Sequence, residues 1–338
     1  MIRPRILRTA AERSPGAPGL KGWLMIAGAY FAASLILSAA EVGEPHATIA
    51  PLASRALLLD VQQSRGRLVA VGERGHILVS EDNAITWRQV EVPTRSTLTG
   101  VAFAEDGLLL AVGHGGVILR SPDFGETWHR IRADVTEEES FLDVLFVNSR
   151  DAIAVGAYGL FLESHDGGST WQRREVAEEG FHFNRITRAL DGTLYIAGEA
   201  GTVLRSLDAA GTWDAIPTPY EGSFFGILDL PDDTQLVFGL RGHVFRTESR
   251  GDDWEPMSVP VPTLIMSGAI LADRRIVLAG QSGNFLVGDD SGQTFEVWKW
   301  GATTGVAEIL PLADGALLVL GEAGAVRVEP PAFPAPTP

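Results

Sequence analysis

The residues whose types and spacing could do chemistry lie in acidic turns. Two stretches match the pattern Ser-x-Asp-x-Gly-x-Thr-Trp in full. They contain Ser121, Asp123, Gly125, Thr127 and Trp128, and then Ser164, Asp166, Gly168, Thr170 and Trp171. A calcium loop is one interpretation, but each turn offers only one or two carboxylates, whereas Ca²⁺ takes about six to eight oxygen ligands. We favour a structural role, in which the carboxylate accepts amides of its own turn, glycine adopts positive φ and tryptophan packs between units.

The acidic turns belong to a unit that recurs along the chain. A glycine opens a tight turn at intervals of 41 to 43 residues, and a second glycine follows three residues later. The first glycines are Gly72, Gly113, Gly156, Gly198, Gly239, Gly280 and Gly321. This period, with strand-like alternation and two turns per unit, predicts an all-β, seven-bladed β-propeller over residues 44–329. Because the last unit supplies only three strands, we expect residues 47–52 to form the fourth strand of blade seven and close the ring.

The acidic turn resembles the Asp-box, or BNR repeat, of sialidases and many non-enzymatic propellers. With its seven units, Gly-x-x-Gly turns and apolar leader, the chain is similar over about residues 47–329 to the photosystem II stability/assembly factor family. The resemblance implies a non-catalytic factor that binds a membrane protein partner, or a transporter accessory in a non-photosynthetic host. It also implies an arginine-rich patch. Arg120, Arg205 and Arg246 recur at one repeat position, which Val79 and Glu163 occupy in other units.

Enzymatic machinery is not evident in the sequence. A sialidase needs an arginine triad, a Tyr/Glu nucleophile pair and an acidic residue, but beyond residue 40 the tyrosines are Tyr158, Tyr195 and Tyr220. The chain has no cysteine, and its seven histidines lack the spacing of metal ligands. We therefore expect no enzyme activity, no cofactor and no metal. A sialidase-like glycoside hydrolase, or a propeller that binds a small ligand, is the alternative.

The inner strands of the predicted blades place polar residues beside a central channel. One position of the repeat, two residues after the apolar start of the strand, holds Asp143, Arg185 and Glu308, and Asp60 is its equivalent in the first unit. These four side chains are expected to form a charged ring in the channel. The alternative is a set of satisfied pairs, such as Asp143 with Arg185.

Partner binding is expected where the repeats differ. The Gly-x-x-Gly turns and the blade-to-blade connections should share one face of the propeller, opposite the Asp-box turns. Aromatic and charged residues on non-repeating loops over a rigid scaffold are typical of a protein-binding surface. The residues predicted to contact the partner are Tyr158, Phe181, Phe225, Trp300, Arg74 and Arg241.

Charge and hydropathy divide the chain. The net charge is −16, and because residues 1–40 contribute +4, the remainder carries −20. An acidic body disfavours nucleic acid as a partner. Residues 1–21 are expected to be a basic cytoplasmic tail, and residues 22–40, which contain no charge, a transmembrane anchor or a signal segment cleaved after Ala40. Either interpretation places the propeller in the periplasm or a lumen. We also expect a monomer, and a disordered Pro-rich tail at residues 330–338.

Overall fold

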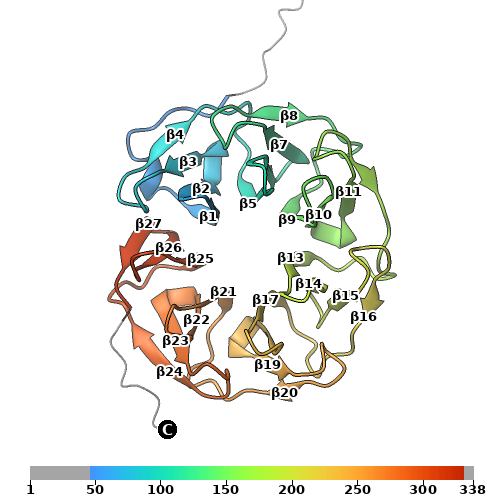
Figure 1. Ribbon diagram of the computed structural model, residues 1–338, viewed down its shortest axis with the longest axis vertical. Coiled ribbons are helices and arrows are strands. Elements are labelled where there is room, and N and C mark those ends of the chain that lie inside the picture. Colours follow the sequence, from blue (N-terminus) through green and yellow to red (C-terminus); the bar gives the residue numbers. More distant parts are fainter. Residues whose placement is uncertain (1–45, 331–338) are drawn as a thin grey trace, which may run out of the picture. The chain divides into compact units, whose positions relative to one another are not determined.

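The predicted seven-bladed β-propeller is confirmed. A computed structural model describes residues 46–330, which form seven antiparallel sheets around a central channel (Figure 1). Blades one to six have four strands each, and blade seven has three within the described residues. In every blade the first strand lines the channel and the last strand lies at the rim (Figure 1).

The strands follow the chain from the channel outward, blade by blade. Blades one to three comprise β1 (Leu58–Ser64), β2 (Arg67–Gly72), β3 (Ile77–Ser80), β4 (Arg88–Val90), β5 (Leu98–Phe103), β6 (Leu109–Gly113), β7 (Val117–Ser121), β8 (His129–Ile131), β9 (Phe141–Phe146), β10 (Ala152–Gly156), β11 (Phe161–Ser164) and β12 (Gln172–Arg173). Blades four to seven comprise β13 (Phe183–Arg188), β14 (Leu194–Gly198), β15 (Val203–Ser206), β16 (Asp214–Ala215), β17 (Phe224–Asp229), β18 (Gln235–Gly239), β19 (Val244–Thr247), β20 (Glu255–Pro256), β21 (Ile265–Ile270), β22 (Ile276–Gly280), β23 (Asn284–Gly288), β24 (Phe295–Lys299), β25 (Val306–Pro311), β26 (Leu317–Gly321) and β27 (Gly324–Val328). Short 3-10 turns are η1 (Ala53–Arg55), η2 (Glu73–Gly75), η3 (Ala157–Gly159), η4 (Leu240–Gly242) and η5 (Gln281–Gly283).

The second strand of each blade is apolar along nearly its whole length because both of its faces are covered by neighbouring blades. In β6 and β10 every residue is buried, whereas rim strands such as β12 and β16 are exposed. Strands buried on both faces lose the alternation of apolar and polar residues, which explains their continuous apolar runs. Burial of these runs between blades holds the ring together.

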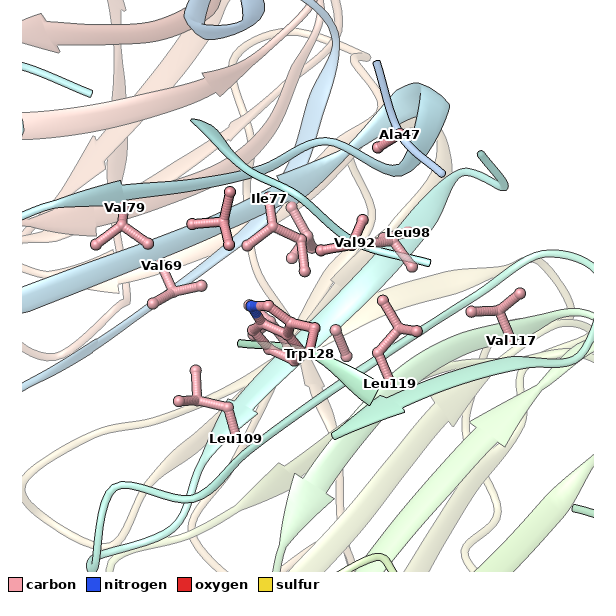
Figure 2. Packing of buried hydrophobic residues seen from close by; sticks show 14 residues of the cluster. Ala47, Val69, Ile77, Val79, Val92, Leu98, Leu109, Val117, Leu119 and Trp128 are labelled. Carbon is pink, nitrogen blue, oxygen red and sulfur yellow. The ribbon is translucent and has the colours of Figure 1, made fainter. Parts of the chain in front are cut away.

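The Asp-box tryptophan fills the layer between two blades. Figure 2 shows Trp128 between Val69 and Val79 of blade one and Leu109 and Leu119 of blade two. Only 5% of Trp128 is exposed, and its indole Nε1 donates to the carbonyl of Gly125 over 3.1 Å. The turn thus places a large apolar side chain against the preceding blade and satisfies its polar atom locally.

Residues 47–52 do not form the fourth strand of blade seven, so that prediction was wrong. Ala47 N donates to Val92 O over 3.0 Å, and the side-chain amide of Gln89 bonds both Thr48 O and Ala50 N. These bonds hold the segment along the rim of blade one. The sequence left residues 47–52 as an unassigned extended segment. It did not show that the side-chain amide of Gln89 binds this segment as both a donor and an acceptor.

Blades seven and one are joined by packing and by one guanidinium. Leu58 and Leu68 of blade one share a core cluster with Leu318 and Leu320 of blade seven. Arg327 of β27 also donates to the carbonyl of Asn83 in the first Asp-box turn. The two blades are therefore in contact through their side chains, without a shared sheet.

The predicted basic tail (residues 1–21), apolar segment (22–40) and most of the Pro-rich tail (331–338) lie outside the described residues. Within residues 46–330, no helix has the length and apolarity needed to cross a membrane.

Candidate functional site

The channel brings four charged side chains together from blades one, three, four and seven. Arg185 on β13 hydrogen-bonds Glu308 on β25, and its Nη1 lies 3.8 Å from Asp60 Oδ1 on β1. Its Nε lies 3.9 Å from Asp143 Oδ2 on β9. One guanidinium therefore faces three carboxylates, two of them across the channel. Ser267 at the same repeat position joins the cluster by donating to Glu308 over 2.5 Å.

The two aspartates of this cluster also bind the main chain of the next blade. In each inner strand a bulge follows the first residue. The second residue is left out of the pairing with the neighbouring strand, and the third and fourth residues resume it. Asp60 Oδ2 accepts the amide of Val101 over 2.7 Å, and Asp143 Oδ2 accepts the amide of Ile186 over 2.9 Å. The carboxylates thus link blade one to two and blade three to four.

Burial dominates the electrostatics of the two aspartates. Asp60 and Asp143 are 1% and 4% exposed. Burial raises the pKa of Asp143 to about 6, against the attraction of Arg185 and with added repulsion from Asp60. Burial likewise raises the pKa of Asp60, again opposed by Arg185 and by amides that donate to the carboxylate. The channel therefore holds carboxylates that take up a proton more readily than free aspartate.

A cavity of about 350 Å³ opens beside this cluster. Its lining combines Asp143, Arg185 and Ser267 with apolar side chains that include Phe103, Phe238 and Met266. Phe238 belongs to the second strand of its blade and was not predicted from the sequence. It reaches the cavity because Gly226 and Gly268 beside it have no side chain, and a Cβ on either would lie within 3.1 Å of its ring.

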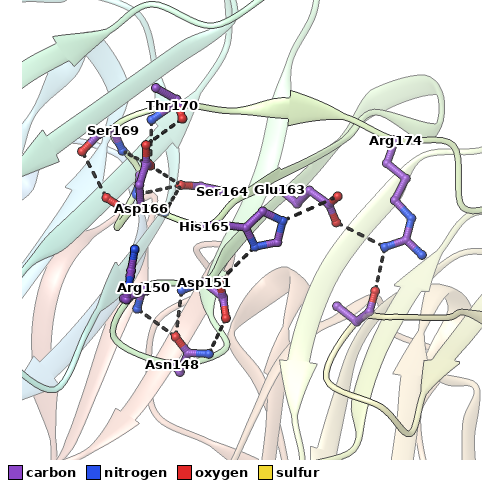
Figure 3. A network of polar contacts seen from close by, with 12 residues as sticks. Asn148, Arg150, Asp151, Glu163, Ser164, His165, Asp166, Ser169, Thr170 and Arg174 are labelled. Atoms are coloured by element: carbon purple, nitrogen blue, oxygen red, sulfur yellow. Dashed lines mark hydrogen bonds and ion pairs between the residues drawn. The ribbon is translucent and has the colours of Figure 1, made fainter.

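The Asp-box turns lie outside the channel and are satisfied within themselves. Asp166 accepts from the Ser164 hydroxyl over 2.9 Å, and from the Thr170 amide and hydroxyl over 2.9 and 2.6 Å (Figure 3). Gly168 N donates to Ser164 Oγ, and Trp171 Nε1 donates to Gly168 O. Asp123 has the same partners in Ser121 and Thr127, with Gly125 N bonded to Ser121.

These turns do not resemble a metal site. Hydrogen bonds from the Thr86 hydroxyl and amide lower the pKa of the equivalent Asp82 to about 2. Among the described residues, no group of three or more His, Asp or Glu side chains is arranged to hold a metal ion. The geometry is that of a carboxylate that organises its own turn.

The recurrent arginines join blades two, four and five to the turn of the next blade that corresponds to the Asp-box. Arg120 Nε donates to Gly167 O over 2.8 Å, Arg205 Nη1 to Arg250 O over 2.9 Å, and Arg246 Nε to Ser291 O over 2.9 Å. In blade three, where Glu163 stands at this position, Arg174 bonds both Glu163 and the Ala210 carbonyl (Figure 3). The guanidinium groups at this repeat position are therefore engaged between blades.

The Gly-x-x-Gly turns and the blade-to-blade connections lie on one face, which we call the Gly-x-x-Gly face. The η3 turn shows the contact: Ala157 N donates to Ser140 O of the preceding connection, and Gly159 N donates to Phe181 O of the following one. This arrangement places Tyr158 beside the connection that carries Phe181. Tyr158 is 79% exposed and Phe181 is 38% exposed.

The other four residues predicted to bind a partner belong to other blades, and two of them, Arg74 and Arg241, lie on turns of the same face. Arg74 and Arg241 are exposed on η2 and η4, the turns of blades one and five. Phe225 is half-buried on the inner strand β17, directly after the fully buried Phe224. Trp300 packs against Phe285 with ring centroids 5.8 Å apart, in the core between blades six and seven. The structure thus groups only Tyr158 and Phe181 among the six.

Comparisons with known proteins agree with this architecture. A family model described as Photosynthesis system II assembly factor YCF48 matches residues 131–270. No curated protein matches the sequence. Similar solved structures include YCF48 bound to D1 peptide, with a TM-score of 0.69 and 18% identity over 82% of this chain and 94% of that one. YCF48 from Cyanidioschyzon merolae has a TM-score of 0.66 and 17% identity, over 84% and 98% of the two chains.

A streptogramin B lyase structure has a TM-score of 0.72 and 12% identity, over 84% of this chain and 96% of that one. Since the enzyme and the two YCF48 proteins are all less than 25% identical to this chain, their likeness shows the fold alone. The family model adds a match in sequence over three of the central blades. Together these findings confirm the predicted resemblance to the photosystem II stability/assembly factor-like family of BNR-repeat β-propellers.

Proposed function

We propose that this propeller is a non-catalytic, extracytoplasmic assembly or stability factor for a membrane protein complex, and that it binds its partner through the Gly-x-x-Gly face. In a non-photosynthetic host, the complex is a transporter. The observation that carries the proposal is Tyr158, which is 79% exposed at the tip of a turn held on both sides by main-chain hydrogen bonds. A rigid, exposed aromatic side chain offers contact area at low entropic cost.

Further support comes from relatives and from the apolar segment. One similar solved structure is that of YCF48 bound to D1 peptide, a protein–peptide complex on the same fold. Residues 22–40 contain no charge and follow a basic tail, which supports export with or without a retained anchor. The carboxylates of the channel are occupied by Arg185 and by main-chain amides, which supports a structural use of these groups rather than catalysis.

The test is affinity capture from detergent-solubilised membranes of the native host. We expect the double variant Tyr158→Ala, Phe181→Ala to lose at least tenfold of the captured membrane protein while its melting temperature stays unchanged. The matched control is Ile85→Ala, Leu207→Ala. These side chains are 69% and 58% exposed on Asp-box turns, so this pair should capture as the wild type does. Equal capture by both variants would place the site elsewhere, and turnover of chromogenic glycosides by the purified protein would contradict the non-catalytic assignment.

A further inference from the structure

The exposed aromatic pair Tyr158 and Phe181 lies between two acidic connections. The connection from blade two to blade three contributes Glu137 and Glu138, and the connection from blade three to blade four contributes Glu178 and Glu179. All four glutamates are exposed. We call these six residues the aromatic–acidic patch.

Main-chain contacts hold the two connections beside the turn that carries Tyr158. Gly116 N, on the corresponding turn of blade two, donates to Glu139 O over 2.8 Å, and Ala157 N, on the turn that carries Tyr158, donates to Ser140 O over 2.9 Å, so the first connection is held between these two turns. On the other side, Gly159 N donates to Phe181 O over 2.8 Å. The patch is therefore built on hydrogen-bonded backbone rather than on free loops.

The aromatic side chains are positioned in advance of binding. Tyr158 has φ of 55°, a left-handed conformation that is costly for a non-glycine residue and turns its side chain outward. Its ring meets His182 edge to face with centroids 4.6 Å apart. The Tyr158 ring therefore keeps one orientation while most of its surface stays open.

The four glutamates are available for a partner. Within residues 46–330, none of their carboxylates has a hydrogen bond or ion pair, whereas the neighbouring Glu139 is engaged by Arg173 and by the Thr136 amide. Four exposed negative charges on the connections that flank the Tyr158 turn attract cations through Coulomb forces, and the aromatic rings add the attraction of their negative faces. The same charges repel a carboxylate-rich or phosphate-bearing ligand.

We infer that the aromatic–acidic patch docks a cationic, lysine- or arginine-containing peptide segment of the partner, a conclusion that rests on the proposed function. Exposed rings supply the apolar contact, and the acids select the charge of the segment and steer its approach. Because these charges are exposed, binding should weaken as salt shortens the Debye length from about 10 Å at 0.1 M to about 3 Å at 1 M.

The test uses a fluorescent synthetic peptide of repeating lysine, glycine and serine, titrated with the purified propeller at physiological ionic strength. Neutralising the patch with Glu137→Gln, Glu138→Gln, Glu178→Gln and Glu179→Gln should weaken binding at least tenfold, or about 1.4 kcal/mol. Tyr158→Leu should weaken it about threefold through the lost cation–π contact.

A matched control removes the same number of charges away from the Gly-x-x-Gly face. Glu105→Gln, Asp214→Asn, Asp253→Asn and Glu255→Gln alter exposed side chains in a hairpin, in an Asp-box turn and on rim strands. This control should change the affinity less than twofold. Equal weakening by both sets would show a general effect of net charge, and no weakening by the patch set would show binding elsewhere; either result overturns the inference.

Membrane capture separates this inference from the proposed function. If Tyr158→Ala, Phe181→Ala loses the membrane partner while the four Glu→Gln changes keep it, the Gly-x-x-Gly face binds a partner but the cationic assignment is wrong. If both variants keep the partner, the proposed function fails as well. If both variants lose the partner, and raised salt also releases the partner from the wild type, the inference is supported.

Discussion

The Asp-box turns and the channel cluster use the same residue type in opposite ways. Asp82 is exposed and bound by its own turn, which lowers its pKa to about 2. Asp143 is buried and bound to the next blade, and burial raises its pKa to about 6. The first arrangement recurs along the chain, whereas the second depends on Arg185, which stands in one blade only.

Residues that recur from unit to unit therefore stabilise their own turn. Residues that differ between units take part in contacts among several blades or, as we propose, with a partner. Every Asp-box carboxylate can be satisfied without help from outside its turn. Asp60, Asp143 and Glu308 require a cation from blade four. Tyr158 is the aromatic member of a turn position that holds Arg74 and Arg241 in other blades, and Tyr158 and the glutamates of the aromatic–acidic patch are exposed rather than buried.

The largest effect on stability is expected from the repeated region. Trp128→Ala should lower the free energy of unfolding by about 4 kcal/mol, because it empties part of the layer between blades one and two. Chemical denaturation measures this loss. Capture of the membrane partner by the folded fraction should be unchanged, and a stable variant that loses the partner would break the distinction between the two regions.

The next largest effect is expected in the channel. Arg185→Met should cost about 3 kcal/mol near neutral pH, because it leaves three buried carboxylates without their cation. The loss should shrink in acid, where the carboxylates take up protons. Denaturation curves at several pH values test this, and a pH-independent loss would contradict the ionic role of Arg185.

The two regions should also respond oppositely to pH. A raised pKa means that the folded state holds the proton of Asp143 more tightly, so its stabilising effect is present below the ordinary value of 3.8 and is lost as pH rises through about 6. The lowered pKa of Asp166 stabilises the fold above 3.8, and this effect is lost as pH falls toward about 2. Asp143→Asn should flatten the stability profile between about pH 4 and about pH 6, whereas Asp166→Asn should change only its acid end.

The smallest expected effect on stability is the difference between alanine substitutions at two glycines of the Asp-box turns. A Cβ on Gly125 would meet Val69 at an ordinary 3.4 Å, whereas a Cβ on Gly168 would lie 2.4 Å from Leu110. Gly125→Ala should therefore cost about 1 kcal/mol for its positive φ alone. Ala84 and Ala210 already adopt this conformation at the same repeat position. Gly168→Ala should cost more in thermal melts, and equal costs would refute the packing argument.

The sequence predicted what repeats and missed what joins distant repeats. The glycine period determined the blade number, and the motif located the turn and the packing of Trp128. The repeat predicted that Asp60, Asp143, Arg185 and Glu308 line the channel, but not that one guanidinium faces all three carboxylates, which depends on distances across the channel. Residues 47–52 were misplaced because their position depends on the side-chain amide of Gln89, a single contact outside the pattern.

The central claim is that function lies on the Gly-x-x-Gly face and not on the Asp-box face. Photo-crosslinking in living cells tests it directly, with a photoreactive amino acid in place of Tyr158 or, on the opposite face, in place of Ile85. We expect a discrete adduct with a membrane protein from position 158 and none from position 85. An adduct of equal strength from both positions, or one from position 85 alone, would contradict the claim.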